Sequence, residues 1–349
     1  MALVYSFAVV ALAATACAGD PIVSPQPVDG RPAAAPSATF TLVSTIAFTT
    51  NRDDPTANPL LAAEIYLMSP DGSSVRRLTS NASGEAFANL DPYGKKIVFD
   101  SNRLRTSDEP LNTSDLFVMN TDGSEQTFLI RGSSATWSPD GKLIAFHASA
   151  SGTGAPIKPD PGAATFDSDI FVLNVDDRLA NAIAARNITN SADAIDDDPD
   201  WSPNGDKIAF TSHAVSDNQI NSVTAEIYVM NADGTGRTQL TSNTEEERGA
   251  AWSPDGTRIV YSCRHNGSDF EICVMNADGS GPEQLTDNTV PDLTATFSPD
   301  GQKILFHRII AGRAQLWVMN PDGSGQTQLT DTPGSNLLAH WGVVRVHIK

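Results

Sequence analysis

The sequence predicts an all-β protein, a six-bladed β-propeller of four-stranded antiparallel blades that is closed by the C-terminal strand. Two observations carry this prediction. An aromatic residue followed by Ser-Pro-Asp-Gly recurs along the chain, with Asn204 in place of Asp in one copy and a degenerate copy at Leu90–Gly94. The repeat unit continues with a short apolar strand, a variable loop, a second apolar strand and an Asn-x-Asp-Gly turn. The spacing of the copies is close to the roughly 40 to 50 residues of a four-stranded blade. The turn glycines are Gly94, Gly141, Gly205, Gly256 and Gly301.

The Ser-Pro-Asp-Gly segments have the composition of tight hairpin turns. The clearest copies are Trp252–Gly256, followed by Ile259–Tyr261, and Phe297–Gly301, followed by Ile304–Phe306. Proline fixes φ at the first corner, aspartate bonds the local backbone, and glycine takes the left-handed position. The loops lack the further carboxylates of a calcium cage, so we interpret these residues as structural.

The second strand of the repeat occurs six times, which sets the number of blades. The first copy has no hairpin before it, whereas Leu337–Trp341 is a first strand with no complete blade after it. We therefore expect the C-terminal segment to supply the innermost strand of the first blade and so remove the open edges. Thr39–Val43 competes for that place. The six copies are Ile46–Phe48, Ile97–Phe99, Ile144–Phe146, Ile208–Phe210, Ile259–Tyr261 and Ile304–Phe306.

Composition sets limits on function. The 349 residues carry a formal net charge of -19, which repels phosphate backbones and argues against nucleic acid as a partner. Beyond the N-terminal stretch, no segment approaches the roughly 20 apolar residues of a membrane span.

The N-terminus has the pattern of an export signal. Residues 2–16 are almost wholly apolar, and Ala14-Thr15-Ala16-Cys17 resembles a bacterial lipobox, by which Cys17 would be lipidated. The alternative is ordinary cleavage at the Ala-x-Ala site formed by Ala16, Cys17 and Ala18. We expect a signal peptide over 1–17, a Pro-rich tether over 18–39 and the propeller over 40–349. The predicted location is the bacterial periplasm or cell surface, with Gly19 favouring an outer-membrane anchor.

The segment Glu226–Gly234, which reads Glu-Ile-Tyr-Val-Met-Asn-Ala-Asp-Gly, together with the Ser-Pro-Asp-Gly hairpins, resembles the WD-repeat-like propeller of the periplasmic TolB proteins. The resemblance covers residues 40–349 and implies an envelope protein that binds a protein partner. TolB proteins carry an α/β domain before the propeller, for which 18–39 leaves no room, so only propeller-borne binding is expected here. The repeats also resemble the propellers of prolyl-oligopeptidase-like enzymes, without the hydrolase domain.

The familiar hydrolase, zinc-protease and nucleotide-binding motifs do not occur in the sequence. His147 and His307 each follow the second-strand aromatic residue, so they hold equivalent places in two blades and are candidates for the channel mouth. Two histidines make a poor metal site, and the plainer interpretation is hydrogen-bonded loop histidines. No metal and no cofactor are expected.

Two cysteines flank one predicted hairpin. Cys263 and Cys273 are symmetric about Ser268, which in that register makes them direct cross-strand neighbours. In an exported protein this favours a disulfide over two buried thiols.

One face of the propeller is predicted to be both loop-rich and acidic. The loops between second and third strands are long in the first four blades and short in the last two. Acidic residues occupy equivalent places before four inner strands, and with their neighbours they are expected to form an acidic rim that attracts a cation or a basic peptide. The alternative is that they cap turns and keep the rim soluble. The candidate rim residues are Glu85, Asp196, Asp198, Glu247 and Asp292.

The leading functional hypothesis is therefore an exported, lipid-anchored propeller that binds a protein or peptidoglycan-associated envelope partner at this face, as a TolB-like scaffold or in transport. The alternative is a glycan-active lyase or hydrolase, or a peptidase-associated propeller, with a site in the central channel. A third hypothesis is assembly with copies of itself.

Overall fold

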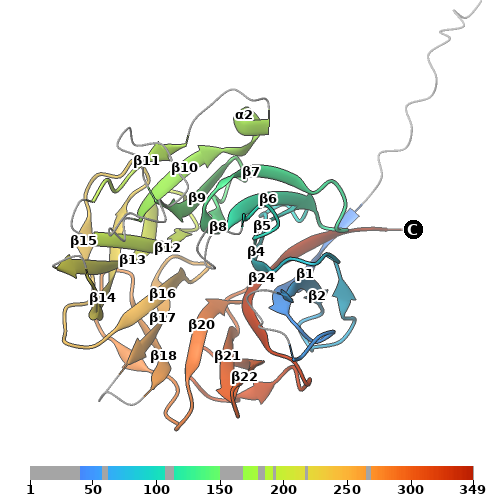
Figure 1. Cartoon of the computed structure of the whole chain (residues 1–349). Coiled ribbons are helices and arrows are strands. Elements are labelled where there is room, and N and C mark those ends of the chain that lie inside the picture. Colours follow the sequence, from blue (N-terminus) through green and yellow to red (C-terminus); the bar gives the residue numbers. More distant parts are fainter. Residues whose placement is uncertain are drawn as a thin grey trace, which may run out of the picture. The chain divides into compact units, whose positions relative to one another are not determined.

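The computed structural model describes residues 40–56, 62–106, 114–149, 168–179, 185–191, 194–216, 219–264 and 269–348. One compact unit runs from Phe40 to Lys349 and contains six four-stranded antiparallel sheets arranged around a central axis (Figure 1). The predicted all-β, six-bladed fold is confirmed. Within the described ranges no helix is long and apolar enough to cross a membrane. Cys17 and the predicted leader and tether lie outside the described residues.

From the inner strand outward, blade 1 contains β24 (Asn336–His347), β1 (Phe40–Thr50), β2 (Glu64–Met68) and β3 (Arg76–Arg77); blade 2 contains β4 (Glu85–Leu90), β5 (Lys96–Ser101), β6 (Asp115–Asn120) and β7 (Thr127–Arg131); and blade 3 contains β8 (Ser133–Trp137), β9 (Leu143–Ala148), β10 (Asp169–Asn174) and β11 (Arg186–Asn187). Blade 4 contains β12 (Ala194–Trp201), β13 (Lys207–Ser216), β14 (Gln219–Asn231) and β15 (Thr238–Gln239); blade 5 contains β16 (Glu247–Trp252), β17 (Arg258–Arg264), β18 (Phe270–Asn276) and β19 (Glu283–Gln284); and blade 6 contains β20 (Asp292–Phe297), β21 (Ile304–Ile310), β22 (Arg313–Met319) and β23 (Thr327–Gln328). A short helix, α2 (Val175–Leu179), follows β10.

The ring is closed by pairing between the first and last strands of the chain. The C-terminal strand β24 pairs antiparallel with β1, from Thr50 opposite Asn336 to Phe40 opposite His347, as predicted. Phe40–Val43, which competed for the inner place in the sequence, instead extends β1 and pairs with Val344–His347. No blade is therefore left with an unpaired inner strand.

The hydrophobic core lies between neighbouring blades. The second-strand aromatic side chains are buried because both faces of the second strand pack against a neighbouring blade. Successive residues of the strand point to opposite faces, so side chains on either side of it enter the core. For example, Ile272 of blade 5 packs in one cluster with Phe297 and Phe306 of blade 6. All six predicted second strands form, within β1, β5, β9, β13, β17 and β21.

The Ser-Pro-Asp-Gly turns of blades 3, 5 and 6, and the related turns of blades 2 and 4, hold the first two strands of the blade in register. In blade 5 the Ser253 hydroxyl donates to Asp255 Oδ1 (2.6 Å) and accepts from the Arg258 amide (2.9 Å). Gly256 takes φ 69°, the left-handed conformation the turn requires. The Ser253 hydroxyl and the Thr257 amide and hydroxyl stabilise the carboxylate and lower the pKa of Asp255 to about 2.

Buried carboxylates at the start of the inner strands bind arginines, and this corrects the predicted acidic rim. Glu85, Asp196 and Asp292 are each 0% exposed, so they do not present charge to solvent. Their carboxylates are occupied by charge-assisted hydrogen bonds, which compensate for the loss of hydration on burial. The pairs are Glu85 with Arg103 Nη2 (2.9 Å to both oxygens), Asp196 with Arg237 Nη1 and Nη2 (3.0 Å each) and Asp292 with Arg308 Nε and Nη2 (2.7 Å each).

Each of these arginines also covers the aromatic pair of its own blade. The guanidinium carbon lies 4.4 Å from the ring centre of Phe117 in blade 2, 4.6 Å from that of Tyr228 in blade 4 and 4.6 Å from that of Trp317 in blade 6. Such cation-π contacts add to the ion pairs. The carboxylate, the arginine and the aromatic rings therefore form one structural unit at the loop-bearing end of these blades.

Blade 5 replaces this unit with a disulfide. Cys273 stands where the other blades have an aromatic residue, and it is bonded to Cys263 with the Cα atoms 5.8 Å apart. The predicted register was wrong, because Cys273 lies opposite Tyr261 and Cys263 opposite Glu271, so the bond is diagonal. The fourth predicted rim acid, Glu247, is 1% exposed and accepts a hydrogen bond from Asn243 Nδ2 (2.6 Å). Burial and the neighbouring Glu226 raise the pKa of Glu247 to about 8, so it is mostly neutral near pH 7.

The ion pair of blade 6 provides a test of this structural interpretation. Asp292→Ala leaves Arg308 without its carboxylate in a largely buried site, so we expect the free energy of unfolding in urea to fall by about 3 kcal/mol, the cost typical of breaking a buried pair. Asp322→Ala, on an exposed turn, is the control and should lower the free energy of unfolding much less. Equal effects of the two substitutions would contradict the structural assignment.

Candidate functional site

All six inner strands carry a β-bulge at the same place. One residue of each takes a positive φ, and in every inner strand the register with its neighbour shifts at this point. A bulge bends its strand and redirects the side chains that follow. The six bulges are therefore the local structure that shapes the channel wall. The residues are Phe87 (φ 49°), Ser134 (52°), Asp198 (47°), Gly249 (65°), Thr294 (55°) and Leu338 (50°).

A hydrogen bond from the preceding blade holds the bulge in several places. The acceptor is the residue after the second-strand aromatic, and the donor is the bulge amide of the next blade. The bonds are Ser134 N to Asp100 Oδ1 (3.2 Å), Asp198 N to His147 Nδ1 (3.4 Å), Gly249 N to Thr211 Oγ1 (3.0 Å) and Thr294 N to Ser262 Oγ (3.1 Å). His147 therefore acts first as a structural acceptor. His307 has the equivalent place in blade 6 and lines the channel.

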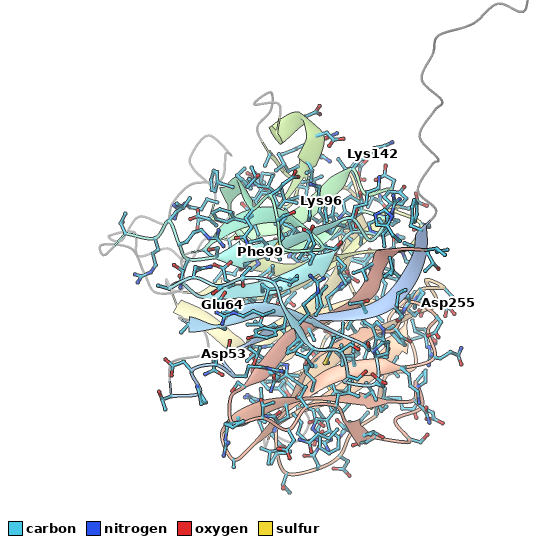
Figure 2. The ribbon with its side chains drawn as sticks, turned by 90° about the vertical axis from the view of Figure 1, so that its right-hand side faces the viewer. Asp53, Glu64, Lys96, Phe99, Lys142 and Asp255 are labelled. Atoms are coloured by element: carbon cyan, nitrogen blue, oxygen red, sulfur yellow. A yellow bond between two sulfur atoms is a disulfide. The ribbon has the colours of Figure 1, made fainter. Side chains whose placement is uncertain are left out.

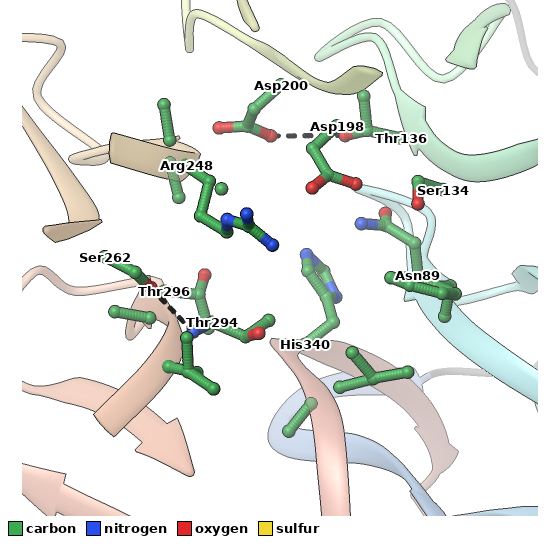
Figure 3. Close-up of a pocket in the computed structure, with 18 of the residues that line it drawn as sticks. Asn89, Ser134, Thr136, Asp198, Asp200, Arg248, Ser262, Thr294, Thr296 and His340 are labelled. Carbon is green, nitrogen blue, oxygen red and sulfur yellow. Dashed lines mark hydrogen bonds between the residues drawn. The ribbon is translucent and has the colours of Figure 1, made fainter. Parts of the chain in front are cut away.

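A cavity of about 400 Å³ lies between the bulges, in the central channel. Each inner strand contributes the bulge residue and the residues around it, so the cavity is lined by all six blades. Figure 3 shows Asp198, Arg248 and His340 extending toward its centre, with hydroxyl side chains around them. A few polar groups on a mostly apolar wall are typical of a ligand-binding cavity.

The wall formed by blade 4 is acidic. Asp198, the fifth predicted rim residue, lines the cavity, and burial next to Asp197 raises its pKa. Asp200 also lines the cavity, but its oxygens accept from Thr136 Oγ1 (3.2 Å) and the Trp252 amide (2.9 Å). Burial raises the pKa of Asp200 to about 7. Asp198 is therefore the carboxyl group of this wall that is best placed to meet a ligand.

A further buried acid, which the sequence did not single out, lies in β5 of blade 2 and bonds the inner strand of blade 3. Asp100 is 3% exposed and accepts hydrogen bonds from the Ser133 and Ser114 hydroxyls and the Ser134 amide. Burial raises the pKa of Asp100 to about 8. Asp100 follows Phe99 as His147 and His307 follow the aromatic residues of their blades, and this equivalence is the sequence signal that could have identified it.

Basic side chains face the acidic wall. Arg248, which was not singled out from the sequence, forms an ion pair with Glu246. Burial lowers the pKa of Arg248, and the nearby carboxylates of Asp197 and Asp198 partly oppose this effect. His307 is 6% exposed, and burial lowers its pKa to about 4, as it does for His340. His340 Nδ1 accepts from the Leu90 amide (3.2 Å). Both histidines are therefore neutral near pH 7.

Two polar atoms of this wall are unused. Among the described residues, His307 Nδ1 and Arg248 Nε are buried without a hydrogen-bond partner. Such groups are costly to bury unless a ligand or water bonds them. In the same ranges, no group of three or more His, Cys, Asp or Glu residues is arranged to hold a metal ion.

The buried titratable groups predict the pH dependence of stability. The folded-state pKa values of Asp100, Asp200 and Glu247 are raised to about 8, 7 and 8. Above about pH 4.5 the folded protein therefore binds more protons than the unfolded chain. The stability that these groups contribute is lost as the pH rises through 7 to 8. His307 and His340 act at lower pH, where stability is lost as the pH falls from 6.5 to 4. We therefore expect the melting temperature to fall between pH 6.5 and pH 9.

An uncharged isostere tests the contribution of one acid. Asp100→Asn should make the decrease in melting temperature between pH 6.5 and pH 9 smaller, because the titrating group is gone. Asp255→Asn is the control, since the pKa of Asp255 is already low and its removal should leave the decrease unchanged. A decrease that is the same in the Asp100→Asn protein would show that Asp100 does not titrate in this range.

The fold is similar to that of known proteins of one family. The family model described as the TolB beta propeller domain matches residues 163–345. TolB from Acinetobacter baumannii superposes with a TM-score of 0.66 at 19% identity, over 86% of this chain and 66% of that one. A structure described as putative TolB from Agrobacterium tumefaciens gives a TM-score of 0.59 at 20% identity, over 88% of this chain and 100% of that one.

A curated relative matches a shorter stretch. Dipeptidyl-peptidase 5 of Porphyromonas gingivalis is 37% identical over 67 residues, which are 19% of this chain and 10% of that protein. The match thus spans about a tenth of the peptidase. Because the TolB beta propeller model covers more than half of the sequence, the chain belongs to the TolB beta propeller domain family.

Proposed function

We propose that this protein is an exported propeller of the cell envelope that binds a protein partner at the loop-bearing mouth of its central cavity, as a TolB-like scaffold or in transport. The family match and the likeness to TolB structures support the kind of partner and the location. The apolar leader supports export, and we further propose that Cys17 is lipidated.

The observation that carries the proposal is the set of unused polar groups in the cavity. Arg248 Nε and His307 Nδ1 are buried without a bond among the described residues, and Asp198 lines the same cavity from blade 4, next to the blade of Arg248. A segment of a partner that brings both donors and acceptors would satisfy them. Of the five predicted rim acids we keep only Asp198 in this site, since the carboxylates of Glu85, Asp196 and Asp292 are occupied by arginines and Glu247 is mostly neutral.

The two faces of the propeller carry different loops. Figure 2 shows Asp53 and Glu64 at one end of the propeller and Lys142 and Asp255 at the other. The loops between blades share the end marked by Asp53, whereas the Ser-Pro-Asp-Gly turns form the end marked by Asp255.

Photocrosslinking in the native envelope tests the proposal. A photoreactive amino acid at Thr244 or Asp331, in exposed loops between blades, should capture one defined protein. The same group at Asp255 or Asp300, on the hairpin turns, is the matched control and should not. Capture should decrease at least about tenfold in an Asp198→Asn, Arg248→Gln protein, because two charged contacts of the site are removed.

Equal capture from both ends, or capture that is indifferent to the double substitution, would contradict the proposed site. Recovery of polysaccharide alone would contradict a protein partner.

The second candidate is a glycan-active enzyme with its site in the same cavity. The observation that favours it is Asp198 on the cavity wall, where burial and the neighbouring Asp197 raise its pKa, since a carboxylic acid with a raised pKa is suited to general acid catalysis. Release of soluble fragments from purified peptidoglycan by the wild-type protein, but not by Asp198→Asn, would support the enzyme. No release by either would leave the binding proposal as the better account.

A further inference from the structure

Strands β1 and β24 form a ribbon that extends beyond the rest of blade 1. Their pairing runs out to Phe40 and His347, whereas β2 pairs with β1 only from Thr50 to Ile46. The chain then turns away after β2, where the Ser69 amide donates to the Ser73 carbonyl (2.8 Å). Residues 40–44 of β1 therefore continue without β2 beside them.

The backbone of β1 is open along this edge. The Arg345 amide donates to the Gly94 carbonyl of blade 2 (3.0 Å), so it points away from β1. Arg345 is the Cα partner of Leu42, and partners in an antiparallel pair either bond each other or both point outward. The N–H and C=O of Leu42 therefore face away from β24. Because this direction alternates along a strand, Phe40 and Ser44 face the same way.

The described residues provide no partner for these groups. Ile46, the next residue in the alternation, is where β2 begins to pair. An added strand at Phe40–Ser44 would thus lie end to end with β2 and complete the edge.

Exposed apolar side chains concentrate on the same ribbon. Of the ten large hydrophobic residues that are exposed in the described ranges, five lie here. Neither 40–50 nor 336–348 contains an Asp or Glu, although the protein has 42 of them. Natural edge strands are usually protected by charge, proline or a covering element. The five residues are Phe40, Leu42, Val43, Val346 and Ile348.

These features fit a protein strand better than a lipid surface. Exposed backbone N–H and C=O groups are very costly in a hydrocarbon environment, whereas a paired strand satisfies them. A second copy of this chain supplies an edge of identical composition, and a two-fold axis leaves no open edge on either copy. The absence of acids keeps like charges out of the contact.

We propose that two copies of this protein associate by antiparallel pairing of their β1 edges, with Leu42 of one copy opposite Leu42 of the second copy. This register makes hydrogen-bonded pairs of all three outward residues, since Phe40 then lies opposite Ser44 of the second copy. The dimer would bury the exposed apolar side chains on both sides of the axis. It is independent of the cavity and of the proposed partner.

Sedimentation equilibrium tests the pairing. A protein that begins at Ala18, purified with the Cys263–Cys273 disulfide intact, cannot be lipidated and should show a reversible monomer–dimer equilibrium. Salt should strengthen the dimer, because it screens the repulsion between two bodies of charge -19. Leu42→Lys and Leu42→Glu should each weaken association at least about tenfold, because like charges then face each other across the axis. Ile310→Lys, at another exposed apolar site, is the control and should associate as the wild type does.

An equimolar mixture of the Leu42→Lys and Leu42→Glu proteins should restore the dimer, since opposite charges then meet at the axis. This rescue distinguishes the proposed register from a general loss of solubility or folding, because both variants must be folded to associate. A wild-type protein that is monomeric at all concentrations and salt levels would overturn the proposal. So would a mixture that remains monomeric, or variants that associate as tightly as the wild type.

Discussion

The structure depends on one pairing, that of β24 with β1. The two strands come from the beginning and the end of the propeller sequence, and the hydrogen bonds between them join the first and last blades into a closed ring. Only in a closed ring do the bulges Phe87 and Leu338 face a common channel with the other four. The cavity therefore exists because the last strand of the chain is placed inside the first blade. The same pairing, continued past the end of β2, also creates the open edge at Phe40–Ser44.

The family and the cavity support different levels of the functional account. The TolB beta propeller match and the fold likeness identify the scaffold, while the chemistry of the channel belongs to this chain. That chemistry is a wall of carboxyl groups around Asp198 facing Arg248 and two neutral histidines, His307 and His340. Most of the other buried charges are consumed by structure, as in the arginine pairs of blades 2, 4 and 6.

The repeat made the blades predictable, because its turns and strands use local rules of backbone and hydrophobic patterning. Ring closure followed from counting a missing first strand at one end and a surplus one at the other. The bulges could not be predicted, since Phe87 and Leu338 are not residues that favour positive φ, and Gly249 is the only glycine among the six. A bulge is imposed by the neighbouring blade, through bonds such as that from the Thr294 amide to Ser262.

The burial of the predicted rim acids was missed for a related reason. Their arginines come from different places in the repeat, since Arg103 follows the second strand of its blade, Arg308 lies within the second strand, and Arg237 precedes the fourth. No sequence period connects them to Glu85, Asp292 and Asp196. The disulfide was predicted from the composition of one hairpin, but its register depended on a loop whose length does not fix the pairing.

Native-state hydrogen exchange tests the closed ring most directly, because it reports the opening of individual strands. The account predicts that the amides of β24 between Asn336 and Trp341 exchange as slowly as those of β9, through global unfolding. Fast exchange of β24 by local opening, while β9 stays protected, would contradict it.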